Sequence, residues 1–416
     1  MSVIVGLFLR NFSSFKLHFN KLNLEKSSSI KDGFQKEMKL ISDAKQKYEG
    51  DSEIKPWDIP YYTHKLKSER HEFQSSELTP YFSISQCFEG MKVLCKQLFG
   101  IDILEVSMDE GESWCEENHN VRKIQLIHES EGPLGIIYLD LHPREGKYSH
   151  SAHFAIRCGC ATNGAECAEK GGNMEYQHPI VGLVCNLSSP EENGVILLSH
   201  SEMETLFHEF GHALHSLLSR TSFQHLSGTR TAVDFVETPS QLMELFVRDA
   251  RVLKSFARHF QTGEPISEEL TSKLADSRRL FQYVDIQTQL LYAYLDQGLF
   301  STPSGEPTTS KFAGLHQKMG IPFAEGTFWH SKFGHVVTYG AGYYSYLLDQ
   351  VFAADIWQTC FASDPFNRAE GHRYRREVLI HGGAKDPNAM LRELLGRNPT
   401  VESYTSMLGG SAYTQK

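Results

Sequence analysis

The spacing of apolar residues predicts a mostly helical chain with one small sheet. Between residues 201 and 217 apolar side chains recur three and four positions apart, which is the period of an α-helix with one buried face. Similar stripes over 83–99 and 267–299 are typical of core-packing helices. Short apolar segments bounded by glycine-rich turns predict three strands, at Ile136–Leu141, His153–Arg157 and Ile180–Leu187. A small sheet should therefore precede the central helix.

The N-terminal part has a different pattern. Residues 1–26 combine a helical stripe of phenylalanines with four positive charges and no acid before Glu25. This pattern is typical of a mitochondrial presequence, and it also fits an ordinary core-packing helix, so both interpretations remain open. From Ser27 to Asp51, interleaved lysines and acids predict a helix with a solvated face. We therefore expect an N-terminal helical segment over residues 1–50 and one large domain over residues 51–416.

Composition and charge narrow the function classes. The chain has 416 residues, of which 40% are hydrophobic and 22% charged, and its formal net charge is −10. A negative balance argues against a nucleic-acid partner, which requires a basic face. No apolar run approaches the ~20 residues that a membrane span needs. We expect a monomer with neither nucleic acid nor membrane as a partner.

The central helix carries the most informative motif, His208-Glu209-Phe210-Gly211-His212. Ser201 and Glu204 just before it have the spacing of a capping box. Because His208 and His212 lie about one turn apart, both imidazoles can converge on a single zinc ion at about 2.1 Å. Glu209 is placed to accept a proton from the attacking water. The competing interpretation is a pair of surface or core histidines.

A zinc hydrolase needs a third protein ligand and an open position. The pattern with a further glycine and histidine on the same stretch fails, because His215 and Leu218 occupy those places. His215 shares the face of His208 but lies about 10 Å along the helix axis, which is too far for one metal. Glu237, 29 residues after His208 in Asp234-Phe-Val-Glu237, leaves room for a loop and a second helix. We predict Glu237 as the third ligand, with His215 as the second choice.

These motifs resemble the thimet oligopeptidase family of zinc metallopeptidases. The similarity extends from about Trp57 to about Gly383 and includes the segment 138–147. It implies a zincin-like catalytic domain, mostly α-helical with a small sheet beside the HExxH helix, and one Zn²⁺ per chain. It also implies hydrolysis of short or unstructured peptides. The segments 256–263, 333–346 and 364–368 are most similar to mitochondrial members, which implies removal of N-terminal octapeptides from precursor intermediates in the matrix.

A stretch rich in tyrosine and glycine, residues 335–346, gains its role from the same resemblance. His335, Tyr339, Tyr343 and Tyr346 match the histidine and tyrosines that face the substrate in this family. Such donors stabilise the negative charge that develops on a peptide carbonyl during attack. The loop is one residue shorter than in thimet-type members, so Tyr339 is the least direct match. Gly342 is a candidate substrate contact.

A strand beside the zinc helix is expected to bind the substrate backbone. In zinc peptidases that resemble this chain, an edge strand pairs with the extended peptide without reading its sequence. Val181–Cys185 is the candidate, with Val181 and Leu183 as contact residues, although an internal strand fits this segment equally well.

Alternatives remain open at this stage. One is a general oligopeptidase, cytoplasmic rather than mitochondrial; another is an inactive zinc-containing fragment that binds peptides, since relatives carry a large helical region before the matched part.

Cys158, Cys160 and Cys167 lie close together, but there is no CxxC, so we expect free thiols rather than a second metal or redox site. For Arg373, Arg375 and Arg376 we expect structural ion pairs.

Overall fold

The computed structural model describes residues 28–71, 77–115, 121–162, 175–187, 191–192, 194–300 and 305–408. Backbone contacts divide the chain into two compact units. The first combines the residues up to Phe73 with Lys273–Val351 and the segment from Thr400 onward, and the second combines Gln74–Ser272 with Phe352–Pro399. The functional boundary expected near residue 50 stays a prediction. The phenylalanine stripe of residues 1–26 lies outside the described residues.

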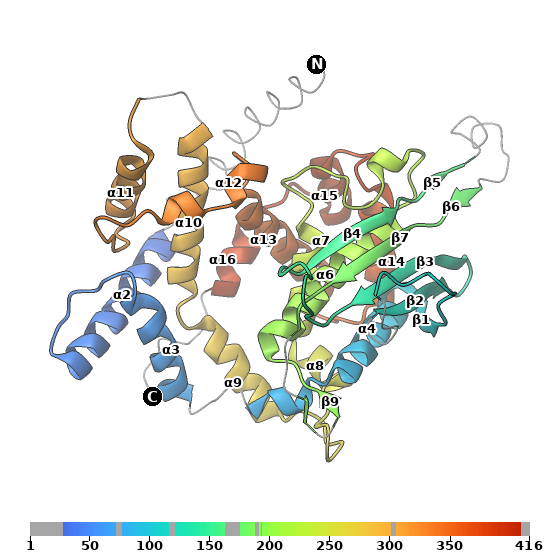
Figure 1. Cartoon of the computed structure of the whole chain (residues 1–416), viewed down its shortest axis with the longest axis horizontal. Helices are drawn as coiled ribbons and strands as arrows, with labels where there is room; N and C mark the ends of the chain where they lie inside the picture. The colour runs from blue at the N-terminus through green and yellow to red at the C-terminus, as the bar shows by residue number, and fades with distance from the viewer. Residues whose placement is uncertain are drawn as a thin grey trace. The chain divides into compact units, whose positions relative to one another are not determined.

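The second unit contains the strands and the helices that pack on them (Figure 1). Its elements are η3 (Thr79–Tyr81), α4 (Ile84–Phe99), β1 (Ile101–Val106), β2 (Val121–His128), β3 (Gly132–Asp140), β4 (Ala152–Arg157), β5 (Cys160–Ala161), β6 (Tyr176–Gln177), β7 (Ile180–Val184), β8 (Glu191–Glu192), β9 (Val195–Ile196), α6 (His200–Leu218), η4 (Gln224–Leu226), α7 (Thr238–Arg248), α8 (Ala250–Phe256), η6 (Trp357–Phe361), α14 (Arg368–Glu377), η7 (Leu379–His381) and α15 (Pro387–Leu395).

The main sheet has five strands in the order β1-β2-β3-β7-β4, with β3 and β7 parallel and the other pairs antiparallel. The three predicted strands are confirmed as β3, β4 and β7, whereas β1 and β2 were not anticipated. The prediction that Val181–Cys185 forms an edge strand is wrong. β7 lies between β3 and β4, and Val181 and Leu183 are buried. An apolar run of this kind is typical of a strand buried on both faces, which does not by itself distinguish an internal from an edge strand.

Helix α6 packs against β3, β4 and β7, and its apolar residues are buried. Its capping box is formed by Ser199 and Glu202, so the pair predicted for this role, Ser201 and Glu204, is wrong. Ser199 has the extended backbone of a cap residue, and its hydroxyl accepts the Glu202 N–H at 3.2 Å. Glu204 instead pairs with Arg248 of α7. Two overlapping S-x-x-E patterns were present, and only the first precedes the helix.

The first unit is helical in its described part. Its elements are α2 (Ser28–Glu49), α3 (Asp58–His71), α10 (Gln282–Phe300), α11 (Thr308–Met319), η5 (Trp329–Lys332), α12 (His335–Thr338) and α16 (Glu402–Leu408), while α9 (Glu268–Arg279) and α13 (Ser345–Ile356) cross the boundary between the units. The stripe predicted over 267–299 is interrupted between α9 and α10, where buried Phe281 has φ 68°. The apolar residues that the sequence suggested as one helical stripe therefore belong to two separate helices.

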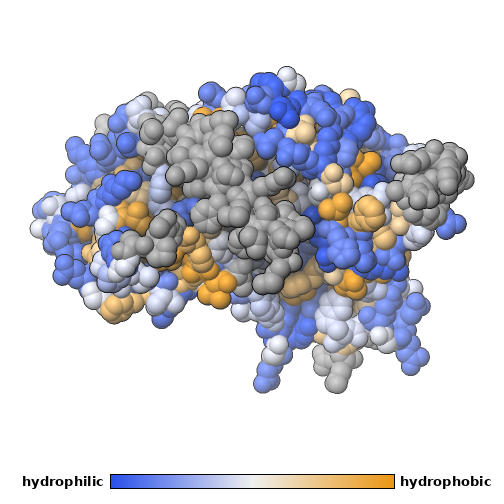
Figure 2. Space-filling view, turned by 90° about the horizontal axis from the view of Figure 1, so that it is seen from above, coloured by the Kyte–Doolittle hydropathy of each residue, from blue (hydrophilic) through white to orange (hydrophobic). Residues whose placement is uncertain are grey.

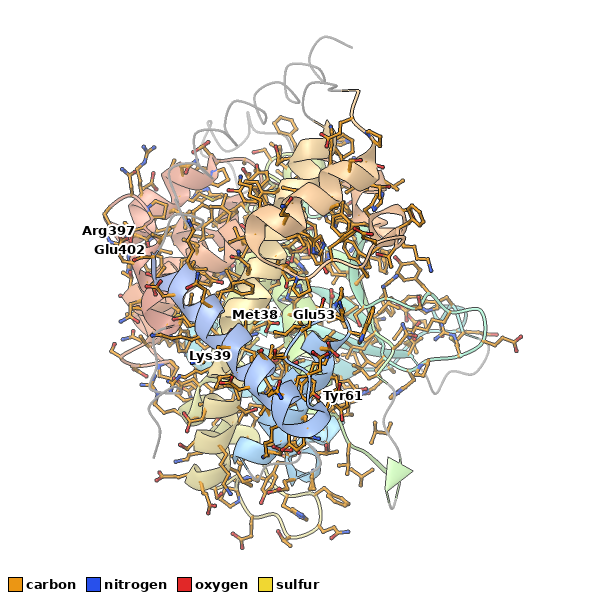
Figure 3. All side chains as sticks on the ribbon, turned by 90° about the vertical axis from the view of Figure 1, so that its left-hand side faces the viewer. Met38, Lys39, Glu53, Tyr61, Arg397 and Glu402 are labelled. Carbon is orange, nitrogen blue, oxygen red and sulfur yellow. The ribbon has the colours of Figure 1, made fainter. Side chains whose placement is uncertain are left out.

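Helix α2 is packed rather than simply solvated. Ile30 and Ile41 are buried against neighbouring helices, and α2 lies beside α3 in Figure 3, where Lys39 of α2 and Tyr61 of α3 are labelled. Two charged side chains are buried as well. Glu37 accepts the Val284 N–H at 2.7 Å, and Lys45 forms a 2.8 Å ion pair with Asp58. Some of the interleaved charged residues of α2 are therefore buried and paired, and the spacing of charges in the sequence does not distinguish them from the solvated ones.

One face of the described surface is largely polar. Figure 2 shows hydrophilic residues over most of the described part of one face, with hydrophobic residues in scattered groups. Among the described residues, no helix is both long and apolar enough to cross a membrane.

Candidate metal centre

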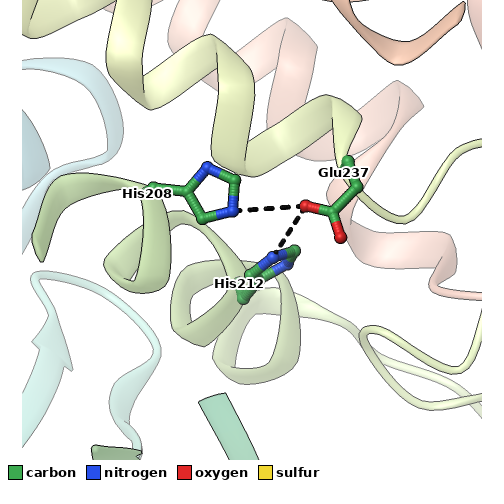
Figure 4. A group of neighbouring side chains, drawn as sticks. All are labelled: His208, His212 and Glu237. Atoms are coloured by element: carbon green, nitrogen blue, oxygen red, sulfur yellow. Dashed lines mark ion pairs between the residues drawn. The ribbon is translucent and has the colours of Figure 1, made fainter. Parts of the chain in front are cut away.

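Two helices of the second unit bring three metal-ligand side chains together (Figure 4). His208 and His212 project from the same face of α6, and Glu237 immediately precedes α7. The Glu237 Oε2 atom lies 3.2 Å from His208 Nε2 and 3.1 Å from His212 Nε2. Within the described residues this is the one group of three or more His, Cys, Asp or Glu donors that lie within 4.8 Å of one another. The donor set of two imidazoles and one carboxylate is one that zinc commonly takes in hydrolases.

Gly211 permits the close crossing that carries Glu237 to the histidines. A Cβ atom at Gly211 would lie 2.6 Å from Ser240 Cα and 2.9 Å from the Pro239 carbonyl oxygen. Any larger residue there would push α7 away from α6. Ser240 then holds the ligand itself, because its hydroxyl donates to the Glu237 carbonyl at 2.8 Å and to Glu237 Oε2 at 3.1 Å.

A second carboxylate orients the first histidine. Glu244 Oε1 lies 2.7 Å from His208 Nδ1, and Glu244 Oε2 accepts from Arg248 at 2.6 Å. A carboxylate on the outer nitrogen of a metal-binding histidine fixes the ring and its tautomer. Sequence reasoning missed this residue, although a signal was present. Glu244 follows Glu237 by seven residues, two helical turns, and therefore lies on the same side of α7.

Contacts within the group favour the charged forms of Glu237 and His208. Burial opposes the charged form of Glu237, but hydrogen bonds from both histidines hold the pKa of its carboxyl well below the usual range. Burial lowers the pKa of His208, and Glu237 and Glu244 more than offset this, raising it to about 10. The site therefore concentrates negative charge around the imidazoles, which is the environment that a divalent cation requires.

Glu209 lies beside the group without belonging to it. Its side chain is 7% exposed, and burial raises the pKa of its carboxyl in spite of the neighbouring histidines. Strand β4 lies beside the same group, because the ring centroid of His153 is 6.2 Å from that of His212. A raised pKa suits a residue that takes up a proton and later returns it.

His215 is outside the group. It is fully buried, and neither ring nitrogen has a hydrogen-bond partner within the described residues. Burial lowers the pKa of His215 to about 3. The structure thus brings Glu237, and not the second-choice residue His215, to the two histidines.

Comparison with known proteins places this site in a family. The model of peptidase family M3 matches residues 18–410. The chain belongs to this family. Three similar relatives are curated mitochondrial intermediate peptidases. That of Homo sapiens is 41% identical over 389 residues, covering 92% of this chain and 53% of the relative. That of Arabidopsis thaliana is 42% identical over 381 residues, with 90% and 52% covered. That of Candida glabrata is 38% identical over 359 residues, with 82% and 47% covered. The chain spans about half the length of these relatives.

The tyrosine-rich stretch of this M3 chain forms a cluster in the first unit. The ring centroid of His335 lies 4.9 Å from that of Tyr343, 5.5 Å from that of Tyr346 and 5.1 Å from that of Tyr339. The four predicted residues are therefore neighbours. Tyr339 remains 56% exposed, whereas burial raises the pKa of Tyr343 to about 12, so its hydroxyl stays protonated at neutral pH.

A buried carboxylate holds the loop that contains Gly342. Asp296 of α10 accepts the N–H of Ala341 at 2.8 Å and that of Tyr343 at 2.9 Å. Ala341 has φ 62°, a left-handed conformation that costs free energy for a residue with a side chain. The Tyr343 hydroxyl donates to Gln289 Oε1 at 2.9 Å. Sequence reasoning missed Asp296 because it is 45 residues away from the loop.

The remaining predictions concern cysteines and arginines. Cys158 and Cys160 are free thiols, as expected, while Cys167 lies outside the described residues. The expectation of structural ion pairs is confirmed: Arg375 pairs with Glu131 at 2.6 Å, Arg373 with Glu370 at 2.5 Å and Arg376 with Glu377 at 2.8 Å.

Proposed function

We propose that this chain is a zinc-dependent metalloendopeptidase that hydrolyses short or unstructured peptides. The observation that carries the proposal is the convergence of His208, His212 and Glu237 beside the buried carboxylate of Glu209, in a chain of peptidase family M3. Two imidazoles and a carboxylate supply three ligands, which leaves a position for water and substrate. Zinc bound there would supply Lewis acidity to the water and to the scissile carbonyl.

Each side chain of the proposed site has a separate role in the reaction. Glu209 accepts the proton of the attacking water and then delivers it to the leaving amine, a role that its raised pKa supports. Glu244 keeps the His208 ring in place through its 2.7 Å contact with Nδ1. We assign stabilisation of the developing oxyanion to Tyr343 and Tyr346, with His335 and Tyr339 as further donors, on the strength of the family resemblance. Gly342 is proposed to give the loop the freedom to approach the substrate.

The strand proposed to bind the substrate backbone is β4. It is an edge strand of the five-stranded sheet, and the ring centroid of its residue His153 lies 6.2 Å from that of His212. An extended peptide added to this edge would run past the catalytic carboxylate, with backbone hydrogen bonds that tolerate many sequences. This assignment replaces the one made for Val181 and Leu183.

The proposed substrates are precursor proteins or peptides in the mitochondrial matrix, from which the enzyme would remove an N-terminal octapeptide. The support is the identity of 41% to the human mitochondrial intermediate peptidase, together with the family resemblance. The chain covers 53% of that relative, so activity must be tested on the chain itself.

One experiment tests activity and substrate class together. The purified chain is incubated with precursor-derived peptides and with unrelated oligopeptides, with and without a chelator, and with zinc added back. We expect chelator-sensitive cleavage that releases octapeptides faster than it trims unrelated peptides. Equal cleavage of both sets would point to a general oligopeptidase. Peptide binding without cleavage by the zinc-loaded chain would point to a non-catalytic binding protein.

A further inference from the structure

A hollow of about 380 Å³ lies at the end of strand β4, apart from the metal ligands. Arg157 lines it from the last position of β4 and Gln177 from β6. Gln224 and His225 line it from η4, and Arg230 from the loop that follows. All of these residues belong to the second unit. The hollow is therefore built from segments as far apart in the chain as Ala155 and Arg230.

The lining is basic and hydrogen-bonding. Two guanidinium groups and one imidazole face the hollow, and no carboxylate lines it, in a chain whose net charge is −10. Among the described residues, neither Arg157 nor Arg230 has an acidic partner within salt-bridge distance. The Nε atom of Arg157 donates to the His178 carbonyl at 3.0 Å, which anchors the side chain while its terminal nitrogens remain available. Arginine forks of this kind match a carboxylate in both geometry and charge.

The position of the hollow connects it with the proposed substrate strand. The ring centroid of His153 lies 6.2 Å from that of His212, and Arg157 follows His153 four residues later on β4. At about 3.3 Å per residue, Arg157 lies roughly 13 Å along the strand from His153 and so from the end of β4 beside the metal ligands. Ile156 has no partner in β7, so a bulge turns the strand next to the hollow. A peptide paired with β4 would place its third to fifth residue from the scissile bond there.

We propose that this hollow, called the Arg157–Arg230 hollow, binds a carboxylate of the peptide substrate. The group is either an acidic side chain or the C-terminal carboxylate, depending on the direction of the peptide along β4. The inference rests on the proposed function, because it takes β4 as the strand that binds the peptide. It adds a selectivity for acidic substrates that backbone pairing alone does not provide.

Binding measured without turnover tests the hollow directly. The full chain carrying Glu209→Gln is loaded with zinc and titrated into fluorescein-labelled peptides, and fluorescence anisotropy gives Kd. Matched peptides carry Glu or Gln three, four or five residues to either side of the scissile bond, and each is made with a C-terminal acid and a C-terminal amide. We expect about tenfold tighter binding of the preferred carboxylate peptide. A preference that follows the Glu position identifies a side chain, and one that follows the acid terminus identifies the C-terminus.

Arginine variants decide whether the hollow is responsible. Arg230→Gln should reduce the preference to within about twofold, and Arg230→Glu should transfer it to peptides with Lys at the same position. The matched control is Arg376→Gln, an exposed arginine of α14 that is not part of the lining, which should retain the full preference. The inference is overturned if Arg230→Gln and Arg376→Gln give the same Glu to Gln ratio, or if no peptide binds.

A parallel assay keeps this inference distinct from the proposed function. Turnover is measured on the same peptides with the native Glu209. Cleavage without any carboxylate preference would overturn the hollow and leave the peptidase assignment intact. A carboxylate preference that Arg230→Gln abolishes, in a chain that cleaves nothing, would support the hollow and overturn the peptidase assignment.

Discussion

At the scale of single residues, adjacent side chains on α6 occupy different environments. His208 and Glu209 follow one another in the chain, yet His208 contacts two carboxylates while Glu209 is buried with a raised pKa. The helical turn of about 100° per residue produces this separation. It allows one segment to supply both ligands and a general base.

The first prediction concerns Glu209. Replacing it by Gln should lower kcat by roughly 100-fold to 10,000-fold, because proton transfer is lost while both histidine ligands remain. Zinc content, measured by metal analysis, should stay at one per chain. A parallel loss of zinc and of turnover would show instead that Glu209 is a ligand.

The second prediction separates the two candidates for the third ligand. Glu237→Ala should abolish stoichiometric zinc, since its Oε2 lies within 3.2 Å of both histidine nitrogens. His215→Leu should keep zinc, and Leu is chosen because the site is fully buried and Ala would leave a cavity. Chelator competition on both variants gives their zinc affinities. The reverse order would exclude the Glu237 assignment.

The third prediction tests the tyrosine loop. Tyr343→Phe should lower kcat about a hundredfold with little change in KM, since an oxyanion donor acts mainly in the transition state. Steady-state kinetics and a melting curve are measured on the same variant. A packing role would show the opposite pattern, with a lower melting temperature through loss of the 2.9 Å hydrogen bond to Gln289 and an unchanged rate.

At the scale of elements, the site depends on how closely α6 and α7 cross. The two helices contact at Gly211, where the backbone of Ser240 fills the space that a side chain would occupy. Glu237 is held at the start of α7, so any separation of the helices also moves the carboxylate away from the histidines. Packing and metal affinity are thus coupled through one glycine.

The fourth prediction follows from that contact. Gly211→Ala should destabilise the chain by about 2 kcal/mol and weaken zinc binding, because its Cβ meets backbone atoms that cannot move independently. The matched control is Gly314→Ala in α11, where no atom lies within 4 Å of the added Cβ. That change should be neutral or stabilising by up to about 1 kcal/mol. Urea unfolding and zinc competition are measured on both, and equal behaviour would contradict the role of the crossing.

At the scale of the whole molecule, stability should depend on pH through a buried carboxylate. Asp140 is 1% exposed and accepts from Arg144 at 2.7 Å, from Lys147 at 2.9 Å and from Trp114 at 2.9 Å. Burial opposes its charged form, but these donors lower the pKa of Asp140 to about 2. Because the pKa is depressed on folding, the unfolded chain binds more protons. The contribution to stability is full above about pH 4 and is lost as pH falls towards 2.

The fifth prediction uses that dependence. Asp140→Asn should lower the free energy of unfolding by about 3 kcal/mol at pH 7, because it leaves the buried Lys147 without its charged partner. The difference from the native chain should be constant between pH 5 and 7 and should shrink below pH 4. Asp102→Asn, at an exposed pair with Lys96, is the control and should cost less than about 1 kcal/mol. Urea midpoints across the pH range provide the measurement, and a pH-independent difference would exclude the ion-pair explanation.

The sequence by itself determined the chemistry of the centre and the elements that carry it. The spacing of His208 and His212 is a local property, because one turn of helix brings the residues together whatever surrounds it. The apolar runs of the strands that became β3 and β7 likewise reflect burial, whereas most residues of β4 are exposed. Glu237 was accessible to sequence reasoning because its distance along the chain allowed a second helix, and its resemblance to a known family pattern supported the same choice.

Tertiary structure alone decided which strand is free, which carboxylate orients His208 and which charges are buried. Strand order depends on pairing between segments that are distant in sequence, so β7 and β4 cannot be ranked as internal or edge from their own residues. Glu244 and Gly211 acquire their roles only where α7 crosses α6. The Arg157–Arg230 hollow likewise forms only when segments distant in the chain fold together. The sequence of each segment gives its side chains but not which other segments they contact.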